Sequence, residues 1–130
     1  MGEDLKCSLW NCSGIASSNS AQEKIDFLFN TADNDFDILV LVETHHKVVQ
    51  DIQSSLLTHS NAYHFLHTGA EEGDAYAGII VLVNKNFEIT DEQALLPGRI
   101  LSFNLKSKNR AYKVSAIYGY TGKQATLTNT

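Results

Sequence analysis

The sequence is poor in several features that would identify particular classes of protein. Its 130 residues include one proline and two cysteines, and no Gly-x-Gly-x-x-Gly, phosphate-loop or Cys-x-x-Cys motif occurs. The apolar run at 38–42 is far shorter than the roughly 20 residues of a membrane-spanning helix. The acidic start, Met-Gly-Glu-Asp, leads directly into a strand-like pattern, so no signal peptide is expected. These absences argue against a plain Rossmann unit, a zinc finger and a membrane protein.

The two cysteines are not expected to pair. If residues 5–11 form a strand, Cys7 and Cys12 lie about 16 Å apart and point to opposite faces. A disulfide requires Cα atoms within about 7 Å of each other. A reducing intracellular location, cytoplasmic or nuclear, is the natural interpretation.

Charge is distributed unevenly along the chain. Residues 1–92 contain all 15 acidic residues and four basic ones, a net charge of −11, whereas residues 93–130 contain six basic residues and no acid. Such asymmetry is typical of a surface that faces phosphate. A solvated hairpin with charged turns explains the charge pattern equally well.

Hydrophobic periodicity predicts strands alternating with helices in the first half of the chain and mainly strands after it. A capping box, Ser20 to Glu23, marks the start of a first helix. The order of elements predicts an α/β fold, with a mixed sheet covered by helices on at least one face. The expected strands are 5–11, 37–42, 63–67, 78–83, 99–105 and 111–118, and the expected helices are 21–32 and 47–58.

Three polar residues follow or end expected strands. Glu43 comes directly after the buried run 38–42, at the carboxyl end of a strand, where open α/β sheets place ligands. Asn11 ends the first strand, and a parallel pairing of strands 5–11 and 37–42 would bring it beside Glu43. Tyr118 ends the last expected strand. For each there is a plainer alternative: a water-facing Glu, a turn-forming Asn and a core aromatic.

The five histidines have no metal-binding spacing. No His-Glu-x-x-His occurs, and no Gly-x-Ser-x-Gly elbow provides a nucleophilic serine. We therefore expect ordinary surface or loop histidines.

An ordered set of short motifs gives the sequence a family resemblance. In chain order they are Trp10-Asn11, Leu-Val-Glu-Thr-His at 41–45, Ala-Gly-Ile-Ile-Val-Leu-Val at 77–83, Gly-Arg-Ile-Leu at 98–101 and Ile117-Tyr118. This set resembles the endonuclease/exonuclease/phosphatase family. Its Glu-Thr-His ending is most similar to the endonuclease domains of non-LTR (LINE-type) retrotransposons and less so to apurinic/apyrimidinic endonucleases.

The resemblance implies a two-layer αββα sandwich and a Mg²⁺-dependent endonuclease, with Mn²⁺ as an alternative metal, that hydrolyses DNA phosphodiester bonds. By this resemblance Glu43 is the metal ligand, and Asn11 and Tyr118 are active-site residues. His45 and Arg99 match positions near the nucleic acid, and the basic hairpin 106–113 is expected to add contacts to the DNA backbone. Where the family usually has Gln before the glutamate, this chain has Val42.

The family's remaining catalytic groups are absent. It has an Asp-x-Asn pair and a C-terminal Asp-His pair, but here no acid follows Glu92 and no histidine follows His67. Residues 1–130 are therefore expected to be the N-terminal half of the sandwich, with the C-terminal half of the domain as its partner. The predicted function is the target-nicking domain of a retroelement. Two alternatives stay open: a phosphoesterase of the same fold acting on lipid or inositol phosphates, and a non-catalytic relic.

Overall fold

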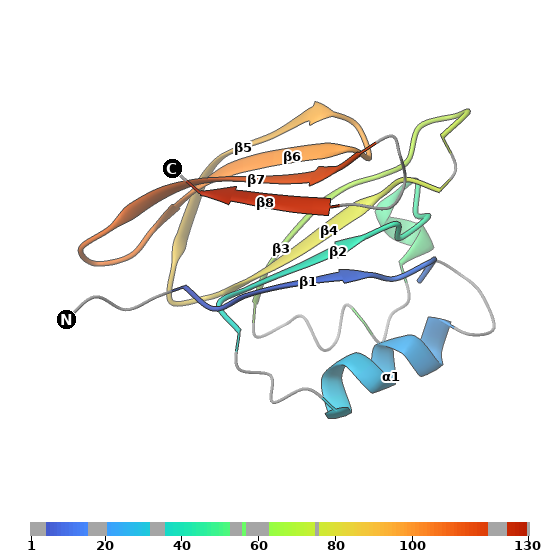
Figure 1. The fold of residues 1–130 in the computed structure, drawn as a ribbon, viewed down its shortest axis with the longest axis horizontal. Coiled ribbons are helices and arrows are strands. Elements are labelled where there is room, and N and C mark those ends of the chain that lie inside the picture. The colour runs from blue at the N-terminus through green and yellow to red at the C-terminus, as the bar shows by residue number, and fades with distance from the viewer. Residues whose placement is uncertain are drawn as a thin grey trace.

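The protein has a mixed α/β fold made mostly of strands, which form two four-stranded sheets. One α-helix accompanies them within the part of the chain that is described (Figure 1). The computed structural model describes residues 5–15, 21–31, 36–52, 56, 63–74, 76–119 and 125–129, with backbone alone at 29–31 and 125–129.

The first sheet is mixed and has the strand order β1-β2-β4-β3. Strands β1 (Cys7–Asn11) and β2 (Ile38–Val42) are parallel, whereas β3 (Tyr63–Thr68) and β4 (Ile79–Asn84) join by antiparallel pairing. Every residue of β2 is buried, because a central strand is covered on both faces. The uniformly apolar sequence of β2 predicted this position.

The second sheet is antiparallel and follows chain order from β5 to β8. Its strands are β5 (Glu88–Leu96), β6 (Ile100–Lys106), β7 (Ala111–Tyr118) and β8 (Ala125–Asn129). The predicted hairpin of β6 and β7 is confirmed. Strands β5 and β8 were not predicted, and β5 shows why: its pairing shifts between Thr90 and Gln93, and its residues are mostly exposed without clean alternation.

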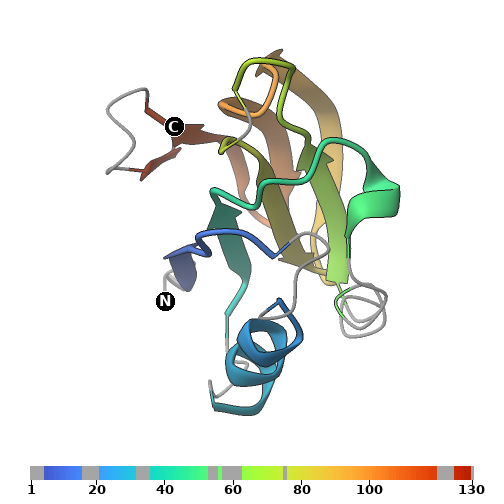
Figure 2. The same ribbon diagram turned by 90° about the vertical axis from the view of Figure 1, so that its right-hand side faces the viewer.

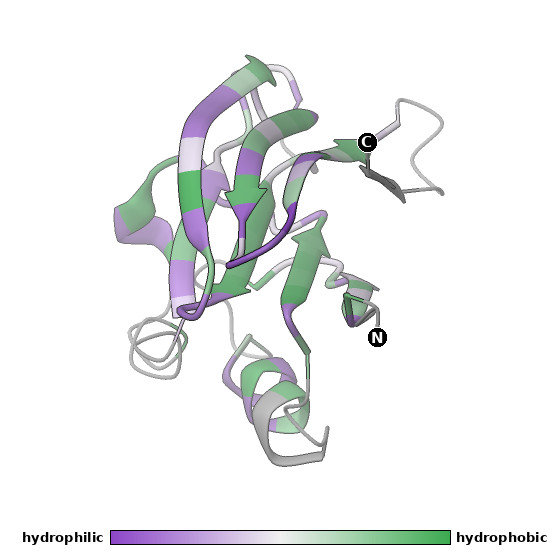
Figure 3. Ribbon diagram, turned by 90° about the vertical axis from the view of Figure 1, so that its left-hand side faces the viewer, coloured by the Kyte–Doolittle hydropathy of each residue, from purple (hydrophilic) through white to green (hydrophobic). Residues whose placement is uncertain are grey.

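Two apolar clusters hold these elements together. One contains side chains from both sheets, including Val40 and Val81 of the first and Phe103 of the second. The other lies on the opposite face of the first sheet, where Ile25 of helix α1 (Ala21–Thr31) packs with Leu41. Figure 2 shows α1 on that face, away from the second sheet. In Figure 3 apolar residues predominate inside, and polar residues alternate with them along the outer strands.

The two predicted helices have different outcomes. The first is confirmed as α1, although the capping residue Ser20 lies outside the described residues. The second prediction, 47–58, is wrong at its start: a short 3-10 helix, η1 (Val49–Asp51), is followed by an extended Ile52. The Asp51 carboxylate explains the tight turn, because it accepts hydrogen bonds from the amides of Lys47 and Val48. Of the rest of that range only Leu56 is described, and it is helical, as predicted.

Cys7 is exposed, Cys12 is buried, and both are free thiols, as predicted. Among the helices of the described residues, none combines the length and the apolar character needed to cross a membrane.

Candidate active site

Three predicted site residues meet at one carboxylate oxygen. The Asn11 amide donates to Glu43 Oε2 at 2.8 Å, and the Tyr118 hydroxyl donates to the same oxygen at 2.8 Å. Asn11 ends β1, Glu43 follows β2, and Tyr118 ends β7 in the other sheet, so the site joins the two sheets at one end. The Glu43 side chain is 18% exposed, so it does not simply face water.

The parallel register of β1 and β2 places Asn11 correctly. Asn11 is paired with Val42, the residue before Glu43. Its side-chain oxygen accepts the amide of Ser13 at 3.0 Å, which directs its NH₂ group toward Glu43. Asn11 therefore both closes a turn and donates a hydrogen bond to the Glu43 carboxylate.

Tyr118 is enclosed and held protonated. It is 4% exposed, and the Arg99 guanidinium lies 4.6 Å from the centre of its ring. Burial and the hydrogen bond to Glu43 raise the pKa of Tyr118 to about 12. At neutral pH its hydroxyl is therefore a hydrogen-bond donor.

Residues 43–46 form a strained loop in which alternate residues point to different sides. Glu43 and His45 have left-handed backbone angles, φ of 58° and 65°, whereas Thr44 and His46 are fully buried. The loop is bonded on one side to residues 14–15 and on the other to 77–78. Left-handed non-glycine residues are costly and cluster at functional sites.

Two glycines make room for this loop. A Cβ on Gly78 would lie 2.3 Å from Thr44 Oγ1, and one on Gly14 would lie 2.6 Å from the His45 ring. Both glycines also have positive φ. The backbone can therefore approach the loop from both sides only because these residues have no side chain.

The inward side chains of the loop form a buried polar chain. His46 Nδ1 is hydrogen-bonded to the Thr44 hydroxyl, and His46 Nε2 lies 3.2 Å from His67 Nδ1 on β3. Burial, with His67 nearby, lowers the pKa of His46 to about 4. The expectation of an ordinary surface or loop histidine is thus wrong for His46. This residue is part of the loop, but its side chain is buried and anchors the loop.

His45, predicted to contact nucleic acid, points to the outward side of the loop beside Glu43. Its Nε2 lies 3.8 Å from Glu43 Oε1, and its ring packs edge-on against Tyr76 at 5.1 Å. The predicted contact with nucleic acid stays a prediction.

Arg99 forms an internal clamp. It is 7% exposed and makes a bidentate ion pair with Asp74, at 2.8 and 2.6 Å, and donates to the Gly119 carbonyl at 2.7 Å. The guanidinium holds the pKa of Asp74 below its usual range. The clamp connects the loop before β4 to the end of β7 and so fixes Tyr118. The predicted contact of Arg99 with nucleic acid also stays a prediction, and the geometry supports the internal role.

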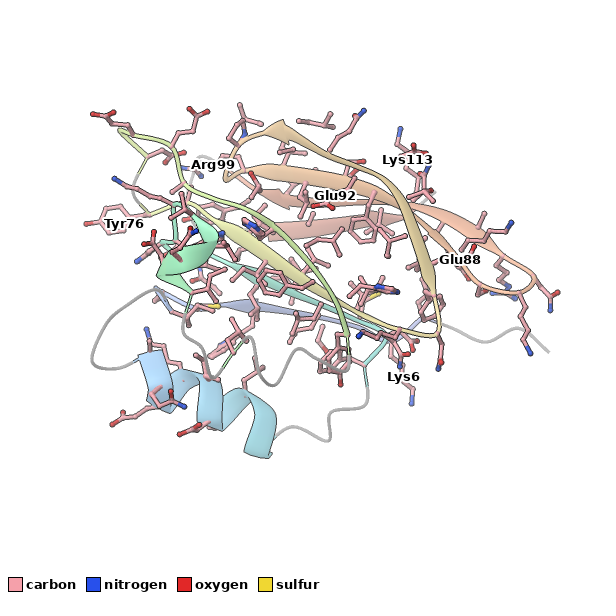
Figure 4. The ribbon with its side chains drawn as sticks, turned by 180° about the vertical axis from the view of Figure 1, so that it is seen from behind. Lys6, Tyr76, Glu88, Glu92, Arg99 and Lys113 are labelled. Carbon is pink, nitrogen blue, oxygen red and sulfur yellow. The ribbon has the colours of Figure 1, made fainter. Side chains whose placement is uncertain are left out.

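The basic hairpin lies at the other end of the sheets. Figure 4 places Lys113 and Glu88 at one end of the molecule and Tyr76 and Arg99 at the opposite one. A shallow groove of about 390 Å³ lies by the hairpin and is lined in part by Lys106, Lys113 and Asn104. The groove is lined by Ala111, Tyr112 and Lys113 of β7, five to seven residues from Tyr118, so the two are separated by roughly 17–23 Å.

The Glu43 carboxylate is a suitable ligand for one position of a magnesium site. Mg²⁺ is usually bound by one or two carboxylates, with water and substrate phosphate as further ligands. Glu43 supplies one carboxylate, which Asn11 and Tyr118 orient. In the described part of the chain no group of three or more His, Cys, Asp or Glu side chains could hold a metal ion. A complete site would require additional ligands.

The chain has no match to any protein-family model, and no curated protein is significantly similar to it.

Sequence reasoning missed the groups that support the site. Asp74 lies in a glycine-rich acidic loop with no periodic pattern, and nothing in its sequence indicates a partner 25 residues away. The glycine of Ala77-Gly78, directly before a buried strand, was the available signal for a close backbone approach.

Proposed function

We propose that Asn11, Glu43 and Tyr118 are part of the active site of a Mg²⁺-dependent phosphodiesterase of the endonuclease/exonuclease/phosphatase type, with DNA as its substrate. The observation that carries this proposal is the convergence of an amide and a phenol, from two different sheets, on one carboxylate oxygen. An ordinary surface glutamate has no need of two positioned donors and a left-handed backbone.

Each residue has a definite role in this proposal. Glu43 would hold the cation, which when bound supplies positive charge to a phosphate oxygen. Asn11 keeps the carboxylate in one orientation through its hydrogen bond. Tyr118 stays protonated at neutral pH, so its hydroxyl can donate either to Glu43 or to a phosphate oxygen beside it.

The fold proposal goes with the function. We propose that the two sheets are the layers of an αββα sandwich and that this chain forms its N-terminal half. The apolar cluster shared by the sheets and the cover of the first sheet by α1 support this arrangement. The further acidic and histidine groups of the catalytic site would then come from the C-terminal half.

The Glu-Thr-His sequence at 43–45 supports a narrower proposal, that the complete domain nicks target DNA for a retroelement. Its structural counterpart is the loop in which Thr44 is fully buried while Glu43 and His45, on the other side, are partly exposed.

The test is Mg²⁺-dependent nicking of supercoiled plasmid by the chain alone and by a form extended at its C-terminus with the rest of the domain. We expect nicking by the extended form only, because one acidic ligand without a general base is insufficient. An extended form that hydrolyses an inositol phosphate or a phospholipid but not DNA would replace the nuclease proposal. A folded extended form with no phosphoesterase activity would indicate a non-catalytic relic.

A further inference from the structure

The His45 imidazole contains a polar atom whose surroundings are incomplete. Among the described residues, His45 Nε2 is the only buried side-chain nitrogen or oxygen that lacks a hydrogen-bond partner. The nearest acidic group is Glu43, whose Oε1 lies 3.8 Å away, too far for a hydrogen bond. Buried polar groups in native proteins nearly always have partners, so an exception calls for an explanation, and a bound ion is one that an imidazole nitrogen beside a carboxylate can satisfy.

The fold holds this nitrogen in place. The His45 amide donates to the Ala77 carbonyl at 2.9 Å, and the residue is fixed in a left-handed conformation. Gly14 lies directly behind Nδ1, and Tyr76 packs edge-on against the ring. The ring therefore presents Nε2 on the side of Glu43, and the fold has accepted backbone strain to keep it there.

A nitrogen and a carboxylate oxygen at this separation suit a shared cation. Divalent transition-metal ions bind imidazole and carboxylate at about 2.1 Å, so the two atoms would be about 3.4 Å apart around a tetrahedral ion. Closing the observed gap requires a movement of only a few tenths of an ångström. With its proton on Nδ1, the neutral ring has a lone pair on Nε2 that can serve as a ligand.

We propose that His45 Nε2 is a second metal ligand beside Glu43 and that it gives the site a preference for first-row transition-metal ions over Mg²⁺. The proposal rests on Glu43 being the metal ligand of the proposed function. Its chemical basis is that imidazole nitrogen binds Co²⁺, Ni²⁺ and Zn²⁺ well, whereas Mg²⁺ selects oxygen ligands. Two ligands do not complete a coordination sphere, and water or phosphate oxygens would fill the remaining positions.

The test measures Co²⁺ and Mg²⁺ affinities of the 130-residue chain by titration calorimetry. The key variant is His45→Asn, because asparagine tolerates the left-handed backbone and lacks the imidazole. We expect wild type to bind Co²⁺ at least about tenfold more tightly than Mg²⁺. His45→Asn should remove most of that preference while leaving Mg²⁺ affinity within about twofold, and Glu43→Gln should weaken both ions.

His64→Ala is the matched control, because His64 is also half-buried but is hydrogen-bonded to the Phe87 carbonyl away from the site. It should leave both affinities unchanged. A direct readout on wild type uses nuclear magnetic resonance with Zn²⁺, which is diamagnetic and so shifts mainly the signals of its own ligands: Zn²⁺ should shift the ring signals of His45 and leave those of His64 in place. This measurement decides the matter even if His45→Asn does not fold.

The inference is overturned if Co²⁺ binds no more tightly than Mg²⁺, if His45→Asn changes neither affinity, or if Zn²⁺ leaves the His45 ring signals in place. These outcomes are independent of nuclease activity. A Co²⁺ preference that depends on His45 in a protein that never nicks DNA would sustain the inference and count against the function. If the extended protein nicks DNA but His45→Asn has the same metal preference as wild type, the function would be supported and the inference would be overturned.

Discussion

Glu43 is the residue on which the site depends, because its carboxylate connects three segments that are distant in the sequence. Asn11 and Tyr118 both donate to Oε2, and His45 lies on the Oε1 side. Substitutions at these positions should differ in kind, since in the proposed site Glu43 and His45 would hold the cation, whereas Asn11 and Tyr118 would orient the carboxylate.

In the extended form that nicks DNA, Glu43→Gln and Tyr118→Phe should fail differently. Glu43→Gln removes the charge that balances the metal, so turnover should fall strongly and added Mg²⁺ should restore part of it. Tyr118→Phe removes one hydroxyl, so Mg²⁺ dependence should stay normal while turnover falls by about 2–4 kcal/mol of transition-state stabilisation. The measurement is initial nicking rate against Mg²⁺ concentration.

Circular dichroism must first show that both variants keep the fold. Rates near wild type in both would mean that the two residues are structural and that the proposed site is wrong.

His46 should make the protein sensitive to mild acid. Its pKa is about 4 in the folded protein, against 6.5 for a free imidazole, so between these values the unfolded chain binds a proton that the folded chain does not. Stability is therefore complete above pH 6.5 and decreases as the pH falls toward 4, by on the order of 3 kcal/mol. Urea unfolding at a series of pH values measures this loss.

The comparison variant is His46→Gln, which can still bond to Thr44 but does not titrate. Its stability should be lower at pH 7 and should change less between pH 6.5 and 4. An equal slope in both proteins would assign the acid sensitivity to other groups, such as His67 or the carboxylates.

At the scale of elements, the 43–46 loop is the feature that converts strand ends into a site. It lies between residues 14–15 and 77–78, with hydrogen bonds to both, and His46 anchors it from beneath. Helix α1 contributes from outside, because Lys24 donates to the carbonyls of Ser13 and Gly14 at 3.0 Å each. The loop is thus hydrogen-bonded to three separate parts of the chain: residues 14–15, residues 77–78 and His67 of β3.

Two glycine substitutions can separate backbone strain from loss of space. Gly78→Ala must accept φ of 116° and a Cβ 2.3 Å from Thr44 Oγ1, so we expect a loss of more than about 2 kcal/mol. Gly73→Ala has φ of 89° with nothing within 4 Å, so strain alone should cost about 1 kcal/mol. Urea denaturation of both variants gives the difference, and equal losses would show that the loop has room to move.

At the scale of the whole molecule, both sheets end on the same side. In the described residues β1 is an edge strand of the first sheet and β8 is an edge strand of the second, and the two lie near each other (Figure 1). Leu9 on β1 is 41% exposed although its partner across the sheet, Val40, is fully buried. Exposed strand edges with apolar side chains promote association between chains.

We therefore expect the 130-residue chain to self-associate through this side. Leu9→Lys should lower the association, because a charge at an edge strand disfavours pairing with another chain. Phe27→Lys is the matched control, since Phe27 is 62% exposed on α1, which covers a face of the first sheet and is not a strand edge. Sedimentation velocity over a range of concentrations measures the effect. A stable monomer at high concentration would count against the half-domain proposal.

The sequence by itself determined most of the elements and the identity of the central residues. The short, β-branched apolar run at 38–42 indicated a strand buried on both faces, and the spacing of Ile25 and Leu28 indicated a helix face. Glu43, Asn11 and Tyr118 could be selected because each follows or ends an expected strand. Local periodicity and strand ends are readable because they depend on near neighbours.

Tertiary structure alone decided how these residues are used. Tyr118 reaches Glu43 across 75 positions, and the Arg99 ion pair spans 25, separations over which local periodicity predicts no contact. The same is true of the buried His46 and of β5, whose irregular pairing is stabilised by β6 rather than by its own alternation. Such features depend on which surfaces meet when the two sheets pack, and burial then sets the protonation of His46 and Tyr118.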